Sequence, residues 1–143
     1  MHPDPLDVAQ AMLDAEGTGP LWGIQIDGVA EGYARIRMLL RAEMLNGHGI
    51  AHGGMVFALA DSACAYAANS RNALSVTQQA SVQFLGQAHE GDWLVAEAIE
   101  LAVVGRMASY RVVVRIDGGA TVAEFSGLTR QLSGAVIKFD DEG

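Results

Sequence analysis

One acidic residue stands alone in the most apolar stretch of the chain. Asp61 is the only charged side chain between Glu43 and Arg71, and its neighbours are alanine, leucine, serine and cysteine. Burying a carboxylate there costs several kcal/mol unless hydrogen bonds or an opposite charge compensate it. Isolated acids of this kind tend to mark sites where they act as a general base or a nucleophile. The alternative is a structural carboxylate, held by hydrogen bonds or placed on a narrow solvent-facing edge.

A glycine-rich segment runs directly into the helix that we predict around this acid. Residues 46–54 read Asn-Gly-His-Gly-Ile-Ala-His-Gly-Gly. The first turn of a helix presents unpaired N–H groups at its positive end, and a glycine there lets a ligand oxygen approach without meeting a Cβ atom. The Gly53 N–H would therefore suit a developing oxyanion. A glycine-rich turn that only begins a helix fits the same residues, and spacing alone favours it.

Other motifs that carry chemistry are incomplete. No Gly-Lys-Ser/Thr follows the glycines, which argues against a phosphate-binding loop. His48 and His52 have zinc-ligand spacing for a helix, but the glycines around them argue against helix, so we expect no metal. Ser62 lacks a Gly-x-Ser-x-Gly elbow. Cys64 has no activating partner, and we expect it to pack as a small hydrophobic side chain.

The spacing between Gly53 and Asp61 limits how the two could cooperate. They lie eight residues apart in one predicted helix, which is about 12 Å at a rise of about 1.5 Å per residue. A base or nucleophile and an oxyanion donor must both lie about 3 Å from the reacting group. If both residues are catalytic, they come from two copies of the chain. We then expect a two-fold dimer whose sites each take Asp61 from one copy and Gly53 from the other.

Strands are expected on both sides of the central helix, which we place at residues 53–69. Alternating apolar residues over 21–40 predict two strands that turn near Asp27 and Gly28. Four further strands are expected as an antiparallel meander, at residues 74–85, 92–104, 107–116 and 121–132. The helix is apolar nearly all round, so it should be covered on every side, and its alanines should allow the strands to approach closely.

We therefore predict an α+β protein with a six-stranded antiparallel sheet wrapped around one hydrophobic helix. Length and composition fit a single domain over residues 1–143. Residues 1–19 should form an N-terminal helix and extension, with Asp4 capping the helix and Gly17 ending it. Residues 133–143 should form a flexible tail.

Composition and charge narrow the classes of partner. Nine basic and seventeen acidic residues give a net charge of -8, which disfavours nucleic acid and anionic membrane surfaces. The longest apolar stretch, residues 55–68, is shorter than the roughly 18 residues of a membrane span and contains Asp61. A single cysteine cannot form an intrachain disulfide, and no basic-then-apolar leader is visible. We expect a cytoplasmic protein.

The chain resembles the phenylacetate-degradation branch of the hotdog-fold thioesterases over residues 20–132. The matching motifs are Asn46 to Gly54, Leu59-Ala-Asp61-Ser-Ala, Ala67-Ala-Asn69-Ser70, Val82-Gln-Phe84-Leu85, Gly91-Asp92-x-Leu94-x-Ala96, Gly105-Arg106 and Val122-Ala-x-Phe125-x-Gly127. The resemblance implies the hotdog fold and hydrolysis of acyl-coenzyme A (acyl-CoA) thioesters, often aromatic ones such as phenylacetyl-CoA. It also implies a homodimer, commonly paired into a homotetramer, without a metal or redox cofactor.

The resemblance also implies a role for each matching residue. Asp61 would be the general base or nucleophile, and the Gly53 N–H would polarise the thioester carbonyl. Asn46 and His52 would position substrate or water, and Thr77 would contact the catalytic water. The remaining substrate-binding residues are expected to be Gly54, Arg106 beside the coenzyme A, and Phe57, with Met55 and Tyr66, in an acyl pocket between subunits. For Arg106, a solvated arginine at a strand end is the alternative.

Departures from the family pattern and two other functions bear on this assignment. Relatives usually carry Arg-Pro after Phe84-Leu85, whereas this chain has Gly86-Gln87, which affects substrate contacts and not the chemistry. A hotdog dehydratase or hydratase would pair its acid with a histidine, but the residue five positions after Asp61 is Tyr66. A non-catalytic acyl-CoA-binding or sensing module would gain nothing from a lone carboxylate near a neutral thioester.

Overall fold

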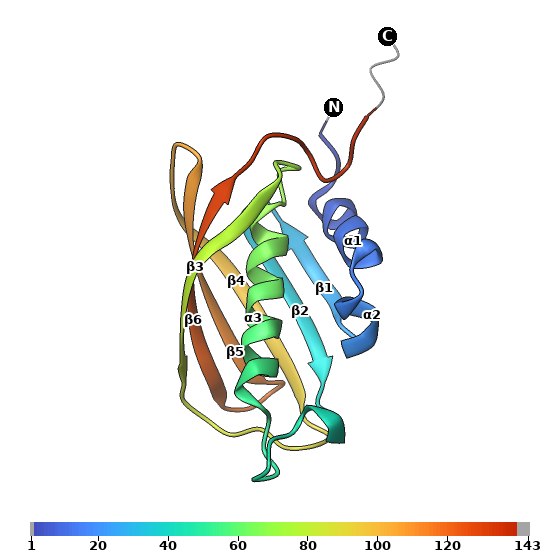
Figure 1. Ribbon diagram of the computed structural model, residues 1–143, viewed down its shortest axis with the longest axis vertical. Helices are drawn as coiled ribbons and strands as arrows, with labels where there is room; N and C mark the ends of the chain where they lie inside the picture. Colours follow the sequence, from blue (N-terminus) through green and yellow to red (C-terminus); the bar gives the residue numbers. More distant parts are fainter. Residues whose placement is uncertain (1, 140–143) are drawn as a thin grey trace.

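A curved antiparallel sheet holds one long helix against its concave face in the computed structural model, which describes residues 2–139 (Figure 1). The helices are α1 (Pro5–Ala15), α2 (Thr18–Trp22) and α3 (Gly53–Ala68), with a short 3₁₀ helix η1 at Ala42–Met44. The strands are β1 (Gln25–Ala30), β2 (Tyr33–Leu39), β3 (Ser75–Phe84), β4 (Trp93–Val104), β5 (Met107–Ile116) and β6 (Thr121–Gln131).

The strands lie side by side in the order β1-β2-β4-β5-β6-β3, and every neighbouring pair is antiparallel. This confirms the six-stranded antiparallel sheet around a central helix. The predicted meander holds only for β4, β5 and β6, because β3 pairs with β6 at the far edge and not with β4. The reason is the path of α3, which follows β2 and carries the chain across the sheet before β3 begins (Figure 1).

The N-terminal helix forms as predicted at its start but ends differently. Asp4 accepts a hydrogen bond from the Leu6 N–H at 2.9 Å, which satisfies one of the free donors of the first turn. The helix ends with Glu16 in extended conformation. Gly17 is not a left-handed C-terminal residue; its φ of -73° is helical, and it begins α2 instead.

The first hairpin turns later than predicted. Trp22 ends α2 and is not part of a strand, and β1 and β2 turn at residues 31–32, where Gly32 has a φ of 70°. Gly28 lies instead at an irregularity in the register between β1 and β2. The Asp27-Gly28 pair, which suggests a turn in the sequence, thus marks this irregularity within β1. In β2 the expected alternation is present, since the arginines at 35 and 37 are more exposed than the apolar residues between them.

Small residues let α3 approach the sheet closely. The fully buried face of α3 consists of Leu59, Ala60, Ala63, Cys64, Tyr66 and Ala67. Opposite this face, β6 carries Gly127, where an added Cβ atom would lie 2.9 Å from the Cys64 sulfur. Cys64 is thus a buried packing residue, as predicted. The alanines of the helix and a glycine of the strand together produce the short distance between the two layers.

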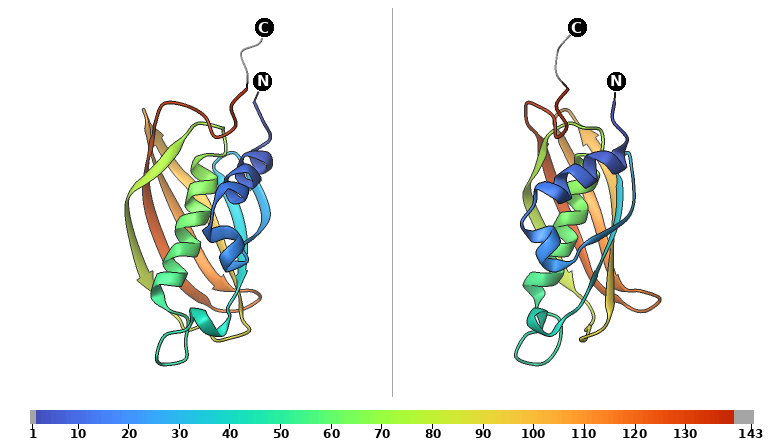
Figure 2. Two further views of the ribbon diagram at one scale, coloured as in Figure 1. Left: turned by 45° about the vertical axis from the view of Figure 1, so that its right-hand side comes forward. Right: turned by 90° about the vertical axis from the view of Figure 1, so that its right-hand side faces the viewer.

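One face of α3 is only partly covered by its own chain. The sheet lies on one side of the helix, and α1 and α2 lie on the same side of the sheet as α3, beside β1 (Figure 2). Between these elements a stripe of half-buried residues remains, namely Phe57, Ala58, Asp61, Ser62, Ala65 and Ala68. The prediction that α3 is covered on every side is therefore wrong for a single copy of residues 2–139.

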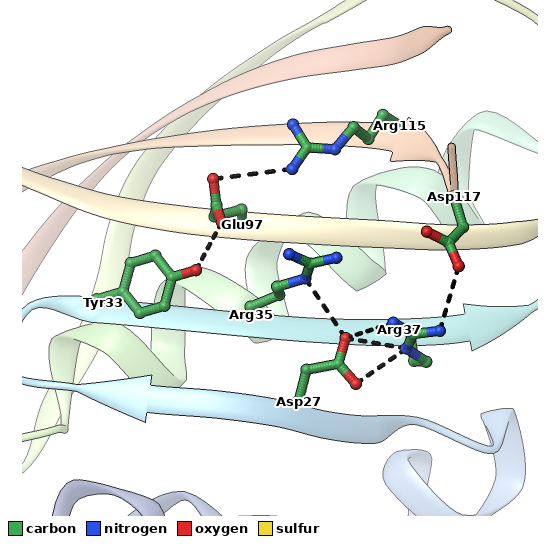
Figure 3. A network of polar contacts seen from close by, with 7 residues as sticks. All are labelled: Asp27, Tyr33, Arg35, Arg37, Glu97, Arg115 and Asp117. Carbon is green, nitrogen blue, oxygen red and sulfur yellow. Dashed lines mark hydrogen bonds and ion pairs between the residues drawn. The ribbon is translucent and has the colours of Figure 1, made fainter. Parts of the chain in front are cut away.

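The face of the sheet that points away from α3 carries a charged network (Figure 3). Arg37 donates through Nε to both carboxylate oxygens of Asp27 at 2.9 Å and forms an ion pair with Asp117 at 3.3 Å. The Tyr33 hydroxyl donates to Glu97 at 2.6 Å. Pairs this close to solvent each stabilise the fold by about 0–1 kcal/mol, so we assign this network to the surface of the sheet and not to a site.

The segment after β6 is attached to the rest of the molecule. The Asn72 amide donates to the Ile137 carbonyl at 2.9 Å and accepts from the Ile137 N–H at 2.8 Å, and the Leu74 N–H donates to the Gly134 carbonyl. The expected flexible tail over residues 133–143 is therefore wrong as far as Ile137, because the Asn72 side-chain amide and the Leu74 N–H anchor it. Residues 140–143 of that prediction lie outside the described residues. Within residues 2–139, no helix is long and apolar enough to cross a membrane.

The contact between α3 and β6 can be tested by adding one methyl group. We expect Gly127→Ala to lower the free energy of unfolding by about 1–3 kcal/mol, because the new Cβ would overlap Cys64 and the Phe125 ring. Gly28→Ala is the matched control, since a Cβ on that strand glycine meets nothing within 4 Å. Urea denaturation of both variants measures the difference. Equal stabilities of the two variants would contradict close packing at Gly127.

Candidate active site

The loop before α3 is organised by one side chain. The Asn46 carboxamide oxygen accepts hydrogen bonds from the N–H groups of His48 at 2.9 Å and Ile50 at 3.3 Å. The Asn46 N–H in turn donates to the Ile50 carbonyl at 2.8 Å. These bonds use the oxygen of the Asn46 side chain and leave its NH₂ group as the free donor. The loop is therefore held in one conformation, which fixes the position of the start of α3.

His52 is the N-terminal capping residue of α3. Its Nδ1 accepts a hydrogen bond from the Gly54 N–H at 2.9 Å, which leaves Nε2 as the ring nitrogen that can donate. A Cβ atom on residue 54 would lie 3.0 Å from Nδ1, so glycine makes room for the imidazole ring. The Gly54 N–H is thus used within the helix cap. The expected contact of Gly54 with substrate remains a prediction.

The Gly53 N–H is the free donor at the start of the helix. Among residues 2–139 it has no hydrogen-bond acceptor, and it belongs to the first turn, where the helix dipole is positive. A Cβ atom on Gly53 would lie 3.1 Å from Cζ of Phe84, the tip of that ring. The donor therefore lies next to an aromatic ring and carries no side chain of its own.

A cavity of about 240 Å³ opens beside this donor. Its walls come from the loop before α3, the first turns of α3, the segment after β3 and the start of β6. The residues that line it are Asn46, Ile50, Ala51, Gly53, Val56, Phe84, Gly86, Gln87, Ala88 and Val122. Sequence reasoning missed Phe84 and Gly86 as site residues, although the departure at Gly86-Gln87 was a signal that the substrate contacts differ here.

The aromatic residues expected in the acyl pocket do not line this cavity. The Phe57 ring packs edge-on against Phe125, with ring centroids 5.5 Å apart. Tyr66 is fully buried, and its hydroxyl donates to the Glu16 carboxylate, with both oxygens at 3.1 Å. Burial raises the pKa of the Tyr66 hydroxyl, and the Glu16 charge adds to this. Tyr66 therefore packs the core. Phe57 lies nine residues before it, about 180° away around the helix, and is half-buried on the side of Asp61, so its predicted place in an acyl pocket between subunits remains a prediction.

Asp61 lies in the middle of α3 with one oxygen unpaired. Its Oδ1 is buried and has no hydrogen-bond partner within residues 2–139. A buried carboxylate oxygen without a partner is costly, so a structural role satisfied by the protein's own hydrogen bonds does not account for it. The side chain is half-buried and belongs to the partly covered stripe of α3. It is available to a group that approaches from outside this copy of the chain.

The Cys64 thiol lies near the acid and contacts Thr77. Burial, and then the charge of Asp61, raise the pKa of the Cys64 thiol to about 12, while a hydrogen bond with Thr77 on β3 opposes the rise. The thiol is therefore protonated at neutral pH and is not a nucleophile. The hydrogen bond places Thr77 beside Cys64, which is one turn of α3 after Asp61.

The predicted site residues thus form two groups within one copy of the chain. Asn46, His52 and Gly53 lie together at the start of α3, beside the cavity. Asp61 lies near the middle of α3, and Thr77 lies on β3 beside Cys64, one helical turn after Asp61. The two groups are separated by eight helical residues, or about 12 Å, so this copy alone does not bring the acid to the Gly53 N–H.

Arg106 belongs to neither group. It lies in the turn between β4 and β5, is exposed, and lines a separate cavity of about 170 Å³ with Ala68 and Arg71 at the other end of α3. Among the described residues no carboxylate lies within ion-pair distance of Arg106, whereas Arg71 pairs with Glu100 at 2.7 Å. Its predicted contact with coenzyme A remains a prediction, as does the alternative of a solvated arginine.

Comparisons with known proteins agree with this architecture. The family model described as the thioesterase superfamily matches residues 48–123. The chain is 34% identical over 128 residues to the acyl-coenzyme A thioesterase PaaI of Escherichia coli (strain K12), covering 90% of this chain and 91% of that protein.

Solved structures give the same result. That of the E. coli PaaI protein from the phenylacetic acid degradation operon matches with a TM-score of 0.89 and 34% identity, over 92% of this chain and 95% of that one. A mutant of the phenylacetic acid degradation protein PaaI from Thermus thermophilus matches with a TM-score of 0.78 and 34% identity, over 82% of this chain and 100% of that one. The expected hotdog fold is confirmed.

The role of Asn46 in the loop can be separated from any role toward a substrate. Asn46→Ala removes the acceptor of two N–H groups, and we expect it to lower the free energy of unfolding by about 1–2 kcal/mol. Asn46→Asp keeps an oxygen in that place and should stay within about 0.5 kcal/mol of the parent protein. Thermal unfolding measures both variants. An alanine variant as stable as the parent would show that Asn46 does not organise the loop.

Proposed function

Because the chain belongs to the thioesterase superfamily, we propose that it hydrolyses acyl-CoA thioesters to a free acid and coenzyme A. The observation that carries this proposal is the buried, unpaired Oδ1 of Asp61 on the open stripe of α3. A carboxylate in that position is available to activate water or to attack a carbonyl carbon. The free N–H of Gly53 supplies the complementary donor for the carbonyl oxygen.

The chemistry of a thioester makes this small set of groups sufficient. A thioester carbonyl is more electrophilic than that of an oxygen ester, and the thiolate leaves readily. Asp61 either takes a proton from water as the water oxygen adds to the carbonyl carbon, or adds to that carbon itself and is released by water in a second step. In both routes the Gly53 N–H stabilises the negative oxygen, and the departing sulfur takes up a proton. Neither route uses a metal or redox cofactor, and the absence of a cofactor remains a prediction.

We propose that two copies of the chain complete each site, and β3 is the element that supports it. β3 is an edge strand of ten residues, and none of its side chains is charged. Edge strands that remain single usually carry charges, prolines or a covering element, since their free N–H and C=O groups otherwise pair with another strand. β1, at the other edge, is shorter, bulged and covered by α1. A second copy therefore fits the β3 edge.

Pairing of two β3 strands would bring the two groups of site residues together. In an antiparallel pair about a two-fold axis, the Phe84 end of one strand lies opposite the Ser75 end of the other. Phe84 lies against Gly53, and Thr77 lies beside Cys64, one helical turn after Asp61. The donor end of one copy would thus meet the acid end of its partner, which is the arrangement that the 12 Å spacing requires.

A homotetramer is proposed as the larger assembly, and a second surface supports it. At the end of β4, Val104 is 78% exposed, and it lines a shallow cavity whose other walls are mainly apolar, with Met107 and Leu128 among them. Apolar side chains gathered in this way on a surface mark contacts between proteins. This surface spans β4, β5 and β6, and none of the residues that line the cavity lies on β3, so dimers could pair through it.

For the acyl group, we propose an aryl or arylacetyl substrate such as phenylacetyl-CoA. Support comes from the resemblance of the glycine-rich segment and α3 to the phenylacetate-degradation branch, and from the 34% identity to the E. coli thioesterase. The apolar walls of the cavity beside Gly53 suit such a group. A cytoplasmic location stays a prediction.

The role of Asp61 is tested by an isosteric change. We expect Asp61→Asn to lower kcat for phenylacetyl-CoA by at least about 10²-fold with binding retained, because the amide cannot accept a proton or attack the carbonyl. Release of free thiol measures turnover, and Ser62→Ala on the same turn of α3 is the matched control. Unchanged turnover in Asp61→Asn would reject the mechanism. Binding of acyl-CoA without turnover in the parent protein would favour the non-catalytic acyl-CoA-binding module.

Shared sites predict that two inactive variants restore activity when mixed. Gly53→Pro removes the proposed donor at the first helical position, where proline is tolerated, and His52 before it is already extended. We expect this change to lower kcat by about 10²- to 10³-fold. In a heterodimer with Asp61→Asn, one of the two sites would hold both an intact Asp61 and an intact Gly53. Mixing the variants should therefore recover part of the parent activity.

Two measurements make this complementation decisive. Gly53→Ala places a Cβ atom against the Phe84 ring as proline does but keeps the N–H, so it should lose less activity than Gly53→Pro. Native mass spectrometry establishes that heterodimers form. Heterodimers that form without any recovery of activity would show that each site is built within one copy.

A further inference from the structure

We propose that Phe84 determines which acyl groups the enzyme accepts, by limiting the size of the cavity in which the acyl group lies next to the Gly53 N–H. The proposal rests on the proposed function, since it assumes that the thioester carbonyl is bound at that N–H. Neither composition nor motif spacing points to Phe84 as a site residue. It comes from the position of the ring between the free donor and the cavity.

The main-chain walls of the cavity are held in place by hydrogen bonds. The Ala51 N–H donates to the Ala88 carbonyl at 2.8 Å, which joins the loop before α3 to the segment after β3. The N–H groups of Leu85 and Gly86 both donate to the Val122 carbonyl, at 2.8 and 3.1 Å. These bonds join the main chains of three of the segments that line the cavity, namely the loop before α3, the segment after β3 and the start of β6. The dimensions of the cavity are therefore changed more readily by a side chain than by movement of a wall.

No side chain can enter the cavity from residue 86. A Cβ atom on Gly86 would lie 2.6 Å from the Thr121 carbonyl oxygen, which is an atom of the main chain and cannot swing aside. The close approach of the two segments thus depends on glycine at this position. Val56, Ala88 and Val122 are at most 2% exposed, so their side chains are held by the core.

Phe84 differs from the other lining residues in size and freedom. It is the largest of them, and it is 53% exposed. Along β3, Ala80 and Val82 pack against the core, so strand alternation turns Phe84 to the same side, toward α3. The tip of its ring lies against Gly53, next to the donor. A group bound at that donor must therefore pass or contact this ring.

The volume and charge of the cavity define the class of acyl group. About 240 Å³ is below the roughly 300–1,000 Å³ of sites that hold a whole small molecule, so the cavity can take an acyl group but not the coenzyme A. Among the described residues that line it, none is charged. Acyl groups that carry a second carboxylate would lose hydration without gaining an ion pair. Compact, uncharged acyl groups are the class that fits.

The test compares acyl groups of increasing size in three variants of the full chain. For the parent protein, Phe84→Ala, Phe84→Trp and Leu85→Ala, kcat/KM is measured with butyryl-, hexanoyl-, octanoyl-, decanoyl- and phenylacetyl-CoA. Phe84→Ala should raise the ratio of kcat/KM for decanoyl-CoA to that for butyryl-CoA by at least about tenfold, and Phe84→Trp should lower it. Leu85→Ala is the matched control, because Leu85 is exposed at the same strand end and does not line the cavity.

Binding measurements separate this proposal from the proposed function. Dissociation constants are measured by calorimetry for ketone analogues in which a methylene group replaces the thioester sulfur, which bind without turnover. A size preference that shifts in Phe84→Ala supports the role of Phe84 even if no variant hydrolyses a thioester. Hydrolysis with an unchanged size preference, or an equal shift in Leu85→Ala, overturns it and leaves the proposed function standing. Absence of both binding and hydrolysis overturns both proposals.

Discussion

The close contact between α3 and the concave face of the sheet is the constraint on which the rest of the molecule depends. Alanines on the helix and Gly127 on β6 bring the two layers together, and Cys64 fills the remaining space. Because the helix is held so tightly on that side, Asp61 can only lie on the opposite, partly open stripe. The Asp61 Oδ1 atom is thereby held in a buried position without a hydrogen-bond partner among residues 2–139.

The rigidity of a helix then decides how the site is assembled. Asp61 and the Gly53 N–H belong to the same rod, so no movement of a loop can bring them to one carbonyl. The loop before α3 is equally fixed, since Asn46 and His52 use their own atoms to organise it. The uncharged β3 edge offers the simplest route by which a second copy can supply what the first lacks. The proposed mechanism and the proposed dimer both follow from the spacing between Gly53 and Asp61 along α3.

The sequence predicts the sheet, the helix, Gly53 and Asp61 because each leaves a local pattern, whereas the roles of Asn46, His52 and Thr77 come from the family resemblance alone. Alternation identifies the strands, and an isolated acid identifies Asp61. Strand order leaves no such pattern, which is why a simple meander wrongly places β3 beside β4. The use of the Gly54 N–H in the helix cap and the burial of Tyr66 against Glu16 depend on contacts that no local pattern records. Phe84 escapes sequence reasoning for the same reason, since only the fold brings it to Gly53.

The uncharged edge strand has a consequence for the behaviour of the protein at low abundance. If a site exists only where two copies meet, the activity per chain is not constant but falls once the protein is diluted below the dissociation constant of the pair. Newly made chains would be inactive until they pair, so activity would appear with the second-order kinetics of pairing. Pairing at the β3 edge would thus make the activity of each chain depend on the concentration of the protein in the cell.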